Sequence, residues 1–365
     1  MTTDATTWTA PTAEETAERF IGNAATMMEV LGTELGVRLG LYRVLAEGAT
    51  DPRGLAESAG IHPRYAREWL EQQAVVGLVR AADTDTDPYA RVFTLPDGPR
   101  EALLDEDSPA YVATLPGFIT SFVTVLPEVA EAFRSGGGVS YETYGAGTRH
   151  GIAGVNRPGY LSQITEWVAT LPDIHARLTT GPARVLDLGC GTGWSSIAIA
   201  EAFPAVSVHG VDLDAASVDE ARANAQRSGL SERVTFEHAD AAAPEAAAPG
   251  YDLVCVFEAF HDMADPVAVL RTARSLLTDG GAVLIADERV AQHFTAPGDL
   301  LERLNYGFSV LHCLPATRAE GATVEAGTVL RPDTLCAYAQ QAGFAECAEL
   351  PIEHDLWRFY RLDPA

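Results

Sequence analysis

The sequence predicts an α/β protein with a doubly wound, mostly parallel sheet, preceded by a smaller and mainly α-helical domain. Two observations lead to this prediction. In the second half of the chain, short apolar segments alternate with segments of helical spacing, as in parallel sheets whose strands are joined by helices. The first of these apolar segments ends in an acid followed by three alternating glycines, which is typical of a tight turn between a strand and a helix. The 365 residues suffice for two domains.

The chain is expected to begin with a disordered lead, residues 1–12, followed by the helical domain, residues 13–134. Apolar residues at helical spacing predict one or two buried helices between Glu14 and Glu47. Near the end of the domain, an aromatic and aliphatic stripe is typical of a core and could also form one wall of a substrate pocket. This stripe consists of Phe118, Phe122, Leu126, Val129 and Phe133.

A winged helix is predicted between these helical stretches. Asp51 is placed to cap a short helix that Gly60 ends, His62 begins a second helix, and two strand-like segments flank a polar loop at 84–88. Winged helices often bind DNA through the second helix, but here that helix carries as many glutamates as arginines. The chain has 25 basic and 51 acidic residues, a net charge of −26. We therefore expect this domain to dimerise and to cap a pocket, with no nucleic acid as partner.

A linker is expected over residues 135–159, because consecutive glycines begin it and glycine and tyrosine are frequent along it. Residues 160–365 are expected to form the sheet domain. The expected strands end at Asp187, Asp212, Asp240, Phe257 and Asp287. The carboxyl ends of parallel strands share one edge of a sheet, and ligands of doubly wound sheets bind there.

The glycine turn follows the pattern Asp-x-Gly-x-Gly-x-Gly, from Asp187 to Gly193. Glycines at every second position let the backbone turn sharply and approach a ligand closely. The spacing departs from a dinucleotide fingerprint, because the place of its third glycine holds Trp194 or Ser196, depending on the register. The chain contains no lysine, which excludes a phosphate-binding loop with a lysine and every mechanism that depends on a lysine amine. The ligand should therefore lack a pyrophosphate.

Acids at the strand ends indicate what the ligand is. Asp212 ends the second strand, where one carboxylate can accept both hydroxyl hydrogens of a ribose. Asp240 could accept from an adenine amino group, and Asp187 faces the turn where a positively charged ammonium would lie. Glu258, just past the fourth strand, belongs to the same row. This edge is expected to bind a cation-bearing nucleoside.

These motifs resemble those of class I S-adenosylmethionine-dependent methyltransferases, over about residues 160–361. The segments that carry the resemblance are Val185–Gly193, Gly210–Asp212, His238–Asp240 and Tyr251–Val254. The resemblance implies a Rossmann-like methyltransferase sheet closed by an antiparallel hairpin, with S-adenosyl-L-methionine as cofactor. It places three residues at the methionine end of that cofactor, Asp212 at its ribose and Asp240 at its adenine. The three are Asp187, Gly189 and Gly191; Gly193 and Glu258 complete the expected cofactor-binding set.

The winged helix before such a sheet is similar to the small-molecule methyltransferases of bacterial secondary metabolism. In those proteins the accessory domain dimerises and caps the pocket. The resemblance therefore implies a homodimer and a small-molecule acceptor, aromatic or polyketide-like.

Two histidines are candidates for a general base. His261 directly follows the fourth strand, near where the methyl group should point, and an ordinary pKa near 6.5 suits removal of a phenol or activated C–H proton. Capping of its own loop is an equally weighted alternative. His312 lies in an insertion after the fifth strand, where a buried structural role is the alternative. Asp287 with Glu288 could suggest a divalent metal, but partner acids are not evident, so no metal is expected.

We therefore expect a cytoplasmic S-adenosylmethionine-dependent methyltransferase in which O-methylation is favoured over C- or N-methylation. The alternatives are a ligand-sensing DNA-binding regulator and a cofactor-binding enzyme that does not methylate. Five scattered cysteines, odd in number, argue against a disulfide framework and fit a reducing compartment. No segment approaches the roughly 20 apolar residues that a membrane span needs, so no membrane partner is expected. The acceptor itself stays open.

Overall fold

The computed structural model describes residues 9–82, 87–324 and 326–364. The chain divides into two compact units, Met1–Pro116 and Gly117–Ala365. Most of the expected lead and part of the expected polar loop at 84–88 therefore lie outside the described residues.

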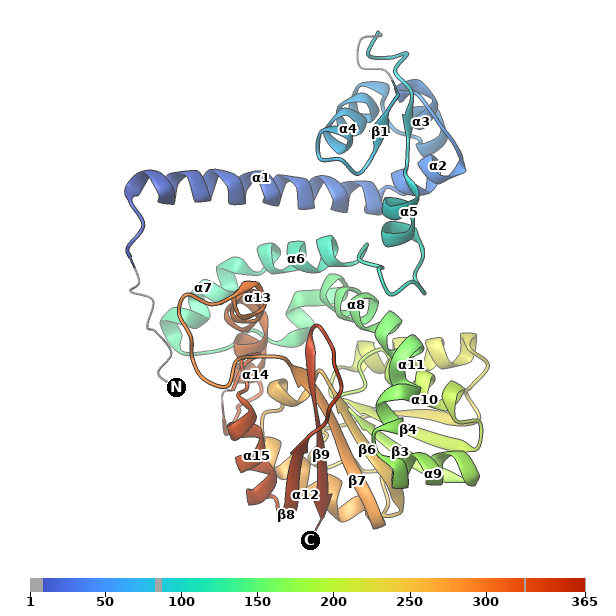
Figure 1. Ribbon diagram of the computed structural model, residues 1–365, viewed down its shortest axis with the longest axis vertical. Coiled ribbons are helices and arrows are strands. Elements are labelled where there is room, and N and C mark those ends of the chain that lie inside the picture. Colours follow the sequence, from blue (N-terminus) through green and yellow to red (C-terminus); the bar gives the residue numbers. More distant parts are fainter. Residues whose placement is uncertain (1–8, 83–86, 325, 365) are drawn as a thin grey trace. The chain divides into compact units, whose positions relative to one another are not determined.

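The first unit is helical, with one small hairpin (Figure 1). Its elements are α1 (Ala13–Arg38), α2 (Leu41–Glu47), α3 (Pro52–Ala59), α4 (Pro63–Val75), β1 (Arg80–Ala81), β2 (Phe93–Thr94) and α5 (Asp97–Leu104). Asp51 caps α3 by accepting from the backbone N–H groups of Arg53 and Gly54, and Gly60 ends that helix at φ 68°. The strands β1 and β2 pair antiparallel. The expected caps and hairpin are present.

Helix α1 differs from its prediction. Its apolar residues are exposed, with Ile21 at 71% and Met28 at 65%, whereas α2 is buried through Leu41 and Leu45. The prediction of buried helices between Glu14 and Glu47 is therefore wrong for α1. Helical spacing identifies an apolar face, but it does not say what covers that face.

The second unit is built around a seven-stranded sheet with the order β5-β4-β3-β6-β7-β9-β8. The strands are β3 (Ala183–Leu188), β4 (Val206–Asp212), β5 (Val234–His238), β6 (Tyr251–Phe257), β7 (Leu277–Glu288), β8 (Phe344–Glu349) and β9 (Trp357–Pro364). The first five strands are parallel to their neighbours, and β9 and β8 close the sheet antiparallel. This confirms the doubly wound α/β class and the closing hairpin.

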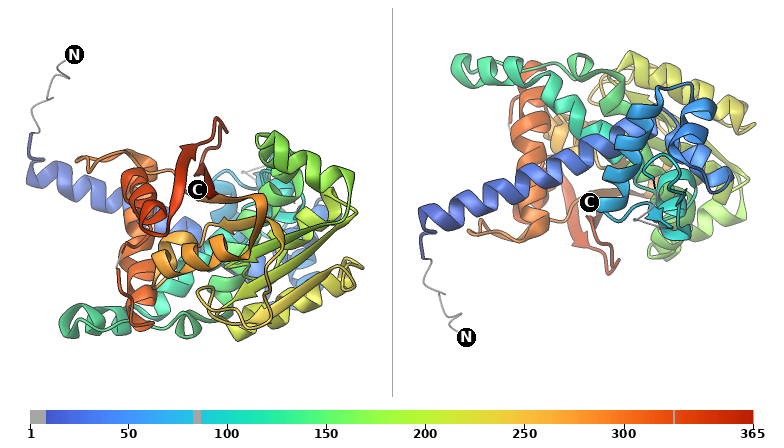
Figure 2. Two further views of the ribbon diagram at one scale, coloured as in Figure 1. Left: turned by 90° about the horizontal axis from the view of Figure 1, so that it is seen from below. Right: turned by 90° about the horizontal axis from the view of Figure 1, so that it is seen from above.

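Helices cover both faces of this sheet (Figures 1 and 2). One face packs against α8 (Tyr141–Ala169), α9 (Pro172–Thr180), α10 (Trp194–Ala202) and α11 (Ala215–Arg227). The other packs against α12 (Pro266–Leu276) and α15 (Pro332–Gln341). Right-handed connections between parallel strands leave their carboxyl ends, and the loops that follow them, at one edge.

The expected boundary at residue 134 and the expected linker over 135–159 are both wrong. The units divide between Pro116 and Gly117. Residues 141–169 form α8, which has non-helical backbone at Gly145. Here glycine permits close packing rather than flexibility, because a Cβ on Gly151 would lie 2.4 Å from the Cβ of Phe118.

Five further helical segments belong to the second unit, and aromatic rings join those that carry Phe118, Phe122, Phe308 and His312. They are α6 (Leu115–Thr124), α7 (Leu126–Ser135), α13 (Leu300–Phe308), a π-helical turn (Ser309–Cys313) and α14 (Leu314–Ala319). The ring of Phe118 on α6 stacks on that of Phe308 at 5.3 Å. Of the expected stripe, Phe118, Phe122 and Val129 are buried in the core of the second unit, whereas Leu126 and Phe133 are exposed, so the prediction is wrong for these two.

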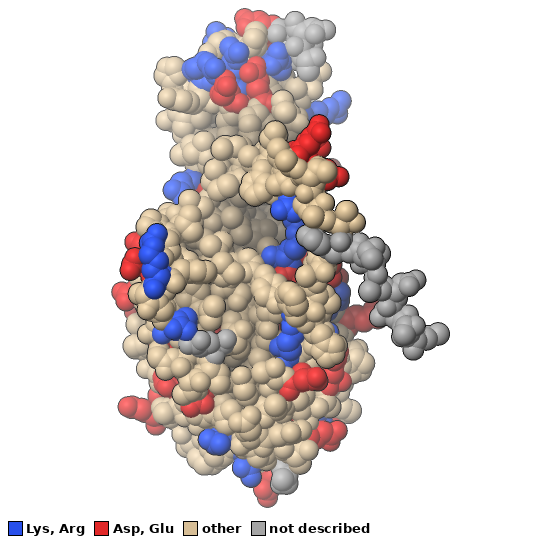
Figure 3. Space-filling model, turned by 90° about the vertical axis from the view of Figure 1, so that its left-hand side faces the viewer, with Lys and Arg blue, Asp and Glu red and all other residues tan. Residues whose placement is uncertain are grey.

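Charges of both signs are dispersed over the face that Figure 3 draws. On the face that Figure 3 draws, the described basic side chains lie among acidic ones and form no continuous basic patch. None of the described helices combines the length and apolarity that a bilayer crossing requires.

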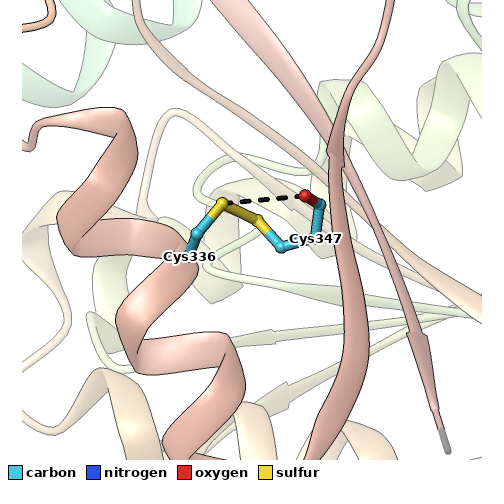
Figure 4. The surroundings of a disulfide bond; sticks show 2 residues. All are labelled: Cys336 and Cys347. Carbon is cyan, nitrogen blue, oxygen red and sulfur yellow. Dashed lines mark hydrogen bonds between the residues drawn. A yellow bond between two sulfur atoms is a disulfide. The ribbon is translucent and has the colours of Figure 1, made fainter.

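A disulfide joins Cys336 on α15 to Cys347 on β8 (Figure 4). The sequence argued against a disulfide framework, and this one bond was not expected. They are 11 residues apart in the sequence, but the turn from helix to strand brings their Cα atoms within 5.6 Å. Cys190, Cys255 and Cys313 are free and buried.

Candidate active site

A pocket of about 770 Å³ lies in the second unit at the carboxyl ends of the parallel strands. Residues that follow β3, β4 and β6 line it, and α8 and the end of α14 complete its wall. This is the edge that the strand order predicts for a ligand.

The glycine turn is held in the left-handed region, with φ of 73° at Gly189, 51° at Gly191 and 83° at Gly193. A Cβ on Gly189 would lie 2.5 Å from the Cβ of Ala259, whereas one on Gly191 would meet no atom within 4 Å. Gly189 and Gly191 both line the pocket. Gly193 instead precedes α10 and packs against Phe236, so the structure assigns it to packing rather than to the pocket wall.

Asp212 lies where β4 ends, and it lines the pocket as expected. Its carboxylate accepts the backbone N–H of Gly191 at 2.7 Å and that of Asp214 at 2.9 Å. Burial raises the pKa of Asp212 to about 6. The two backbone donors fix the carboxylate beside the glycine turn.

Asp187 lies behind the turn rather than in the pocket wall. It is 1% exposed. The hydroxyls of Ser195 and Ser196 donate to it, both at 2.6 Å. Burial raises its pKa. The structure therefore does not bring Asp187 to the ligand side that the sequence predicted, because its carboxylate anchors the first turn of α10.

Asp240 is exposed and accepts the backbone N–H of Ala242 at 2.8 Å. It does not line the pocket, but His238, two residues earlier on β5, does. His238 was not predicted, because a histidine at the end of a strand carries no signal that distinguishes it from a structural one.

Glu258 lines the pocket directly after β6. Among the residues that the structure describes, it is the non-glycine residue with positive φ, at 51°. Its carboxylate accepts from the side-chain amide of Asn156 on α8 and hydrogen-bonds the carboxyl of Glu288 on β7. Burial raises both pKa values, that of Glu288 to about 7; the charge of Asp287 raises both further, and the charge of Glu288 adds to the rise at Glu258. Nothing in the sequence signalled this pairing.

His261 forms a buried dyad with Asp287. Its Nδ1 lies 2.8 Å from Asp287 Oδ1, and its backbone N–H donates to the other oxygen at 3.0 Å. Its Nε2 lies 3.5 Å from Asp262 Oδ1, a buried atom with no hydrogen-bond partner. Burial opposes the charged imidazole, but Asp262 and Asp287 outweigh it and raise the pKa of His261 well above its usual value.

The Cys313 thiol lies beside the same imidazole, and the donor atoms of His261, Asp262 and Cys313 all lie within 4.8 Å of one another. A metal could in principle use such a group. The expected absence of a metal stays a prediction.

His312 lies in an aromatic cluster rather than in the pocket wall. It is 2% exposed, and its ring lies 4.6 Å from that of Tyr144 and 5.6 Å from that of Tyr141. Burial lowers the pKa of His312 to about 4. The neutral imidazole adjoins Tyr141, which lines the pocket.

The chain is similar in sequence to known methyltransferases. A family model described as "Methyltransferase domain" matches residues 180–324. The 27-O-demethylrifamycin SV methyltransferase of Amycolatopsis mediterranei is 34% identical over 33% of this chain and 47% of its own length. The ubiquinone biosynthesis O-methyltransferase of Ralstonia nicotianae is 30% identical over 47% of this chain and 67% of its own length. The chain thus spans about half the length of the first of these relatives.

Solved structures resemble the whole chain in fold. The mitomycin 7-O-methyltransferase MmcR has a TM-score of 0.72 at 21% identity, covering 97% of this chain and 98% of that one. Human N-acetylserotonin methyltransferase, in complex with S-adenosylmethionine, has a TM-score of 0.70 at 17% identity, covering 98% and 100%. At these identities the likeness concerns the fold.

Proposed function

Since the chain belongs to the class I S-adenosylmethionine-dependent methyltransferases, we propose that it transfers the donor's methyl group to a hydroxyl oxygen of a small-molecule acceptor. The observation that carries this proposal is the His261–Asp287 dyad at the end of β6, beside a pocket with a carboxylate suited to a ribose. Methyl transfer from a sulfonium is a displacement along one line, and it needs a base only where the nucleophile carries a proton.

The pocket residues fit the donor. Asp212 offers two carboxylate oxygens already oriented by backbone donors, as two ribose hydroxyls require. Gly191 leaves open space where a side chain would otherwise stand. When bound, S-adenosylmethionine supplies an electrophilic methyl group. Gly189, Gly191, Asp212 and His238 would hold it.

The dyad defines which nitrogen of His261 acts. Asp287 engages Nδ1, which leaves Nε2 as the nitrogen that can accept a proton. His261 itself does not line the pocket, but its Nε2 lies 3.5 Å from the unpartnered Oδ1 of Asp262, which does. An acceptor hydroxyl at this place would give its proton to Nε2 while its oxygen takes the methyl group and S-adenosylhomocysteine leaves.

The test is formation of S-adenosylhomocysteine with a panel of phenolic and hydroxylated polyketide compounds. For an acceptor that reacts, His261→Ala should lower turnover roughly 100- to 10,000-fold, the range for loss of a general base. Affinity for S-adenosylhomocysteine should stay unchanged. A mutant with wild-type turnover would remove His261 from the mechanism, and a product methylated at carbon or nitrogen would replace O-methylation by one of its alternatives.

A DNA-binding role receives less support from the helix that would enter the groove. Arg64 on α4 pairs with Glu68, and Arg67 pairs with Glu71. Their charges are thus already compensated within the helix. We propose an accessory role for this unit, and tight, sequence-dependent retention of DNA fragments in a filter assay would contradict it.

We also propose that the protein is a homodimer in the cytoplasm. The support for the dimer is the exposed apolar face of α1, which includes Phe20, Ile21, Met27, Met28, Leu31 and Leu35. Faces of this kind are typical of protein interfaces.

The support for the cytoplasm as compartment is the presence of three buried free thiols. The Cys336–Cys347 bond counts against it.

A further inference from the structure

We propose that Glu258 and Glu288 together form a subsite for a primary ammonium group, which is the α-amino group of the donor's methionine part. The proposal rests on the proposed function, because it presumes that this donor occupies the pocket. It differs from the expectation drawn from the motif, which gave the ammonium to Asp187.

The strand order places this pair at the correct end of the ligand. Asp212 follows β4 and Glu258 follows β6, and β3 with its glycine turn lies between these two strands. A nucleoside whose ribose contacts Asp212 must cross the glycine turn to reach β6. The end that arrives there is the amino-acid end. Ala259, next to Glu258, is in contact range of Gly189, so the pair borders the turn itself.

Asp187 is closed off from the place where the ammonium would lie. Both of its hydrogen bonds from Ser195 and Ser196 end on one oxygen, Oδ2, and the residue is 1% exposed. It does not line the pocket, whereas Glu258 does. The carboxylate that a ligand's ammonium can meet at this end is therefore that of Glu258.

The pair is suited to one positive charge. Two carboxyls that hydrogen-bond one another in a buried place cannot both be ionised. When the pair has lost one proton, the two carboxyls share the remaining proton and carry one negative charge between them. Around them, α8 contributes the amide of Asn156 and the phenol of Tyr160. His261, in the turn after β6, and Asp287 on β7 act on the pair through their charges, Asp262 acts on Glu288, and Asp187 acts on Tyr160.

The backbone at Glu258 also indicates a function. A residue other than glycine rarely adopts φ near 51°, and such strain persists only where the surroundings enforce it. Here the Glu258 N–H donates to the carbonyl of Ala286 at 2.7 Å, which ties the strained residue to β7. This bond aligns Glu258 with the strand that carries Glu288.

The experiment compares two ligands that differ by the amino-acid part. S-adenosylhomocysteine carries the ammonium, and 5′-methylthioadenosine lacks it. Calorimetry on the full chain should show that Glu258→Gln weakens the first about tenfold or more and leaves the second unchanged. Asp212→Asn is the matched control, because it should weaken both.

The number of protons released when the ligand binds gives a second readout. An ammonium favours the ionised pair, so binding of S-adenosylhomocysteine near neutral pH should release protons, and its affinity should increase with pH. The heat of binding in two buffers of different ionisation enthalpy measures this release. In Glu288→Gln the charge of Glu288 no longer acts on Glu258, so the release should become smaller, while the part that burial causes remains.

The outcomes separate this proposal from the proposed function. If neither ligand binds the wild-type protein, the proposed function fails. If both bind and Glu258→Gln affects both equally or neither, the ammonium subsite is wrong while the cofactor assignment stands. If donor affinity is unchanged but the KM of an amine-bearing acceptor rises, the ammonium belongs to the acceptor, and the proposal is overturned in favour of that source.

Discussion

Asp187 and Asp212 are the same residue type at the ends of neighbouring strands, yet their contacts give them different roles. Asp187 receives two serine hydroxyls and is closed off, whereas Asp212 receives two backbone N–H groups and borders the pocket. The first arrangement stabilises the start of α10. The second leaves the carboxylate available to a ligand.

Substitution of these two acids should therefore change different quantities, ligand affinity for Asp212 and the free energy of unfolding for Asp187. Asp212→Ala should weaken S-adenosylhomocysteine binding by about 1 to 3 kcal/mol, the range for lost hydrogen bonds to a charged group. Asp187→Asn should lower the free energy of unfolding by about 1 to 3 kcal/mol, because it disturbs two buried hydroxyl donors. Calorimetry and urea unfolding measure the two quantities. Unchanged affinity in Asp212→Ala would refute the ribose assignment.

The dyad predicts a pH dependence. Asp262 and Asp287 raise the pKa of His261 well above its usual value of 6.5. The imidazole is therefore still protonated at pH 6.5, and it becomes a base only at higher pH. Turnover on a hydroxyl acceptor should therefore rise with pH through a value above 6.5 and be lost as pH falls. Asp287→Asn removes one of the two raising charges and should move the rise to lower pH. A pH profile that is flat in the wild type, or unmoved in the variant, would contradict a base role.

The sequence predicted the site residues that a local motif contains and missed those that only the fold brings together. Asp212, Gly189 and Gly191 follow from spacing along the chain. Glu258 and Glu288 are 30 residues apart and meet because β6 and β7 are neighbours. The burial of His312 depends on rings from α6 and α8, and a single sequence gives no sign of that contact.

At the scale of elements, the same limit explains α8. Its frequent glycines predicted a linker because glycine weakens an isolated helix. The structure shows glycine where another helix approaches, at Gly151 against Phe118 and at Gly147 against Ser121. The composition of the segment shows that glycine weakens the helix, but it does not show the helix–helix contact that compensates for this loss of stability. The strands were easier to predict, because buried parallel strands are continuous apolar runs.

The Cys336–Cys347 bond links α15 to β8 and should stabilise the edge of the sheet. Closing a loop of 11 residues stabilises a fold by roughly 3 kcal/mol in the chain-entropy model. The double substitution Cys336→Ser and Cys347→Ser should lower the unfolding free energy by about 2 to 3 kcal/mol, measured with denaturant under oxidising conditions. A reducing agent should produce a similar loss in the wild type and none in the variant.

Thiol counting then tests the compartment. Protein trapped with an alkylating agent at lysis and then denatured should show five free thiols if the cytoplasm keeps this pair reduced, and three if the bond is present in the cell. Three would count against the cytoplasmic proposal, because disulfides are rare in that compartment.

At the scale of the whole molecule, the exposed face of α1 predicts self-association. Ile21, Met28 and Leu35 recur every seven residues and are 71%, 65% and 48% exposed. Burying each such side chain is worth roughly 1.5 to 3 kcal/mol, so a second copy of α1 that covers this face would gain substantially. The double substitution Ile21→Glu and Met28→Glu should convert a dimer, at twice 38.8 kDa by light scattering, into a monomer. It should leave the helical circular dichroism signal in place.

Thr26→Glu is the matched control, because Thr26 is exposed and lies on the side of α1 opposite the apolar face. This variant should remain dimeric. A wild-type protein that is monomeric at micromolar concentration would overturn the homodimer proposal, and so would a double variant with unchanged mass. If the variant is monomeric yet binds S-adenosylhomocysteine with wild-type affinity, the donor site is complete within one chain. That result is expected, because every residue lining the pocket belongs to the second unit.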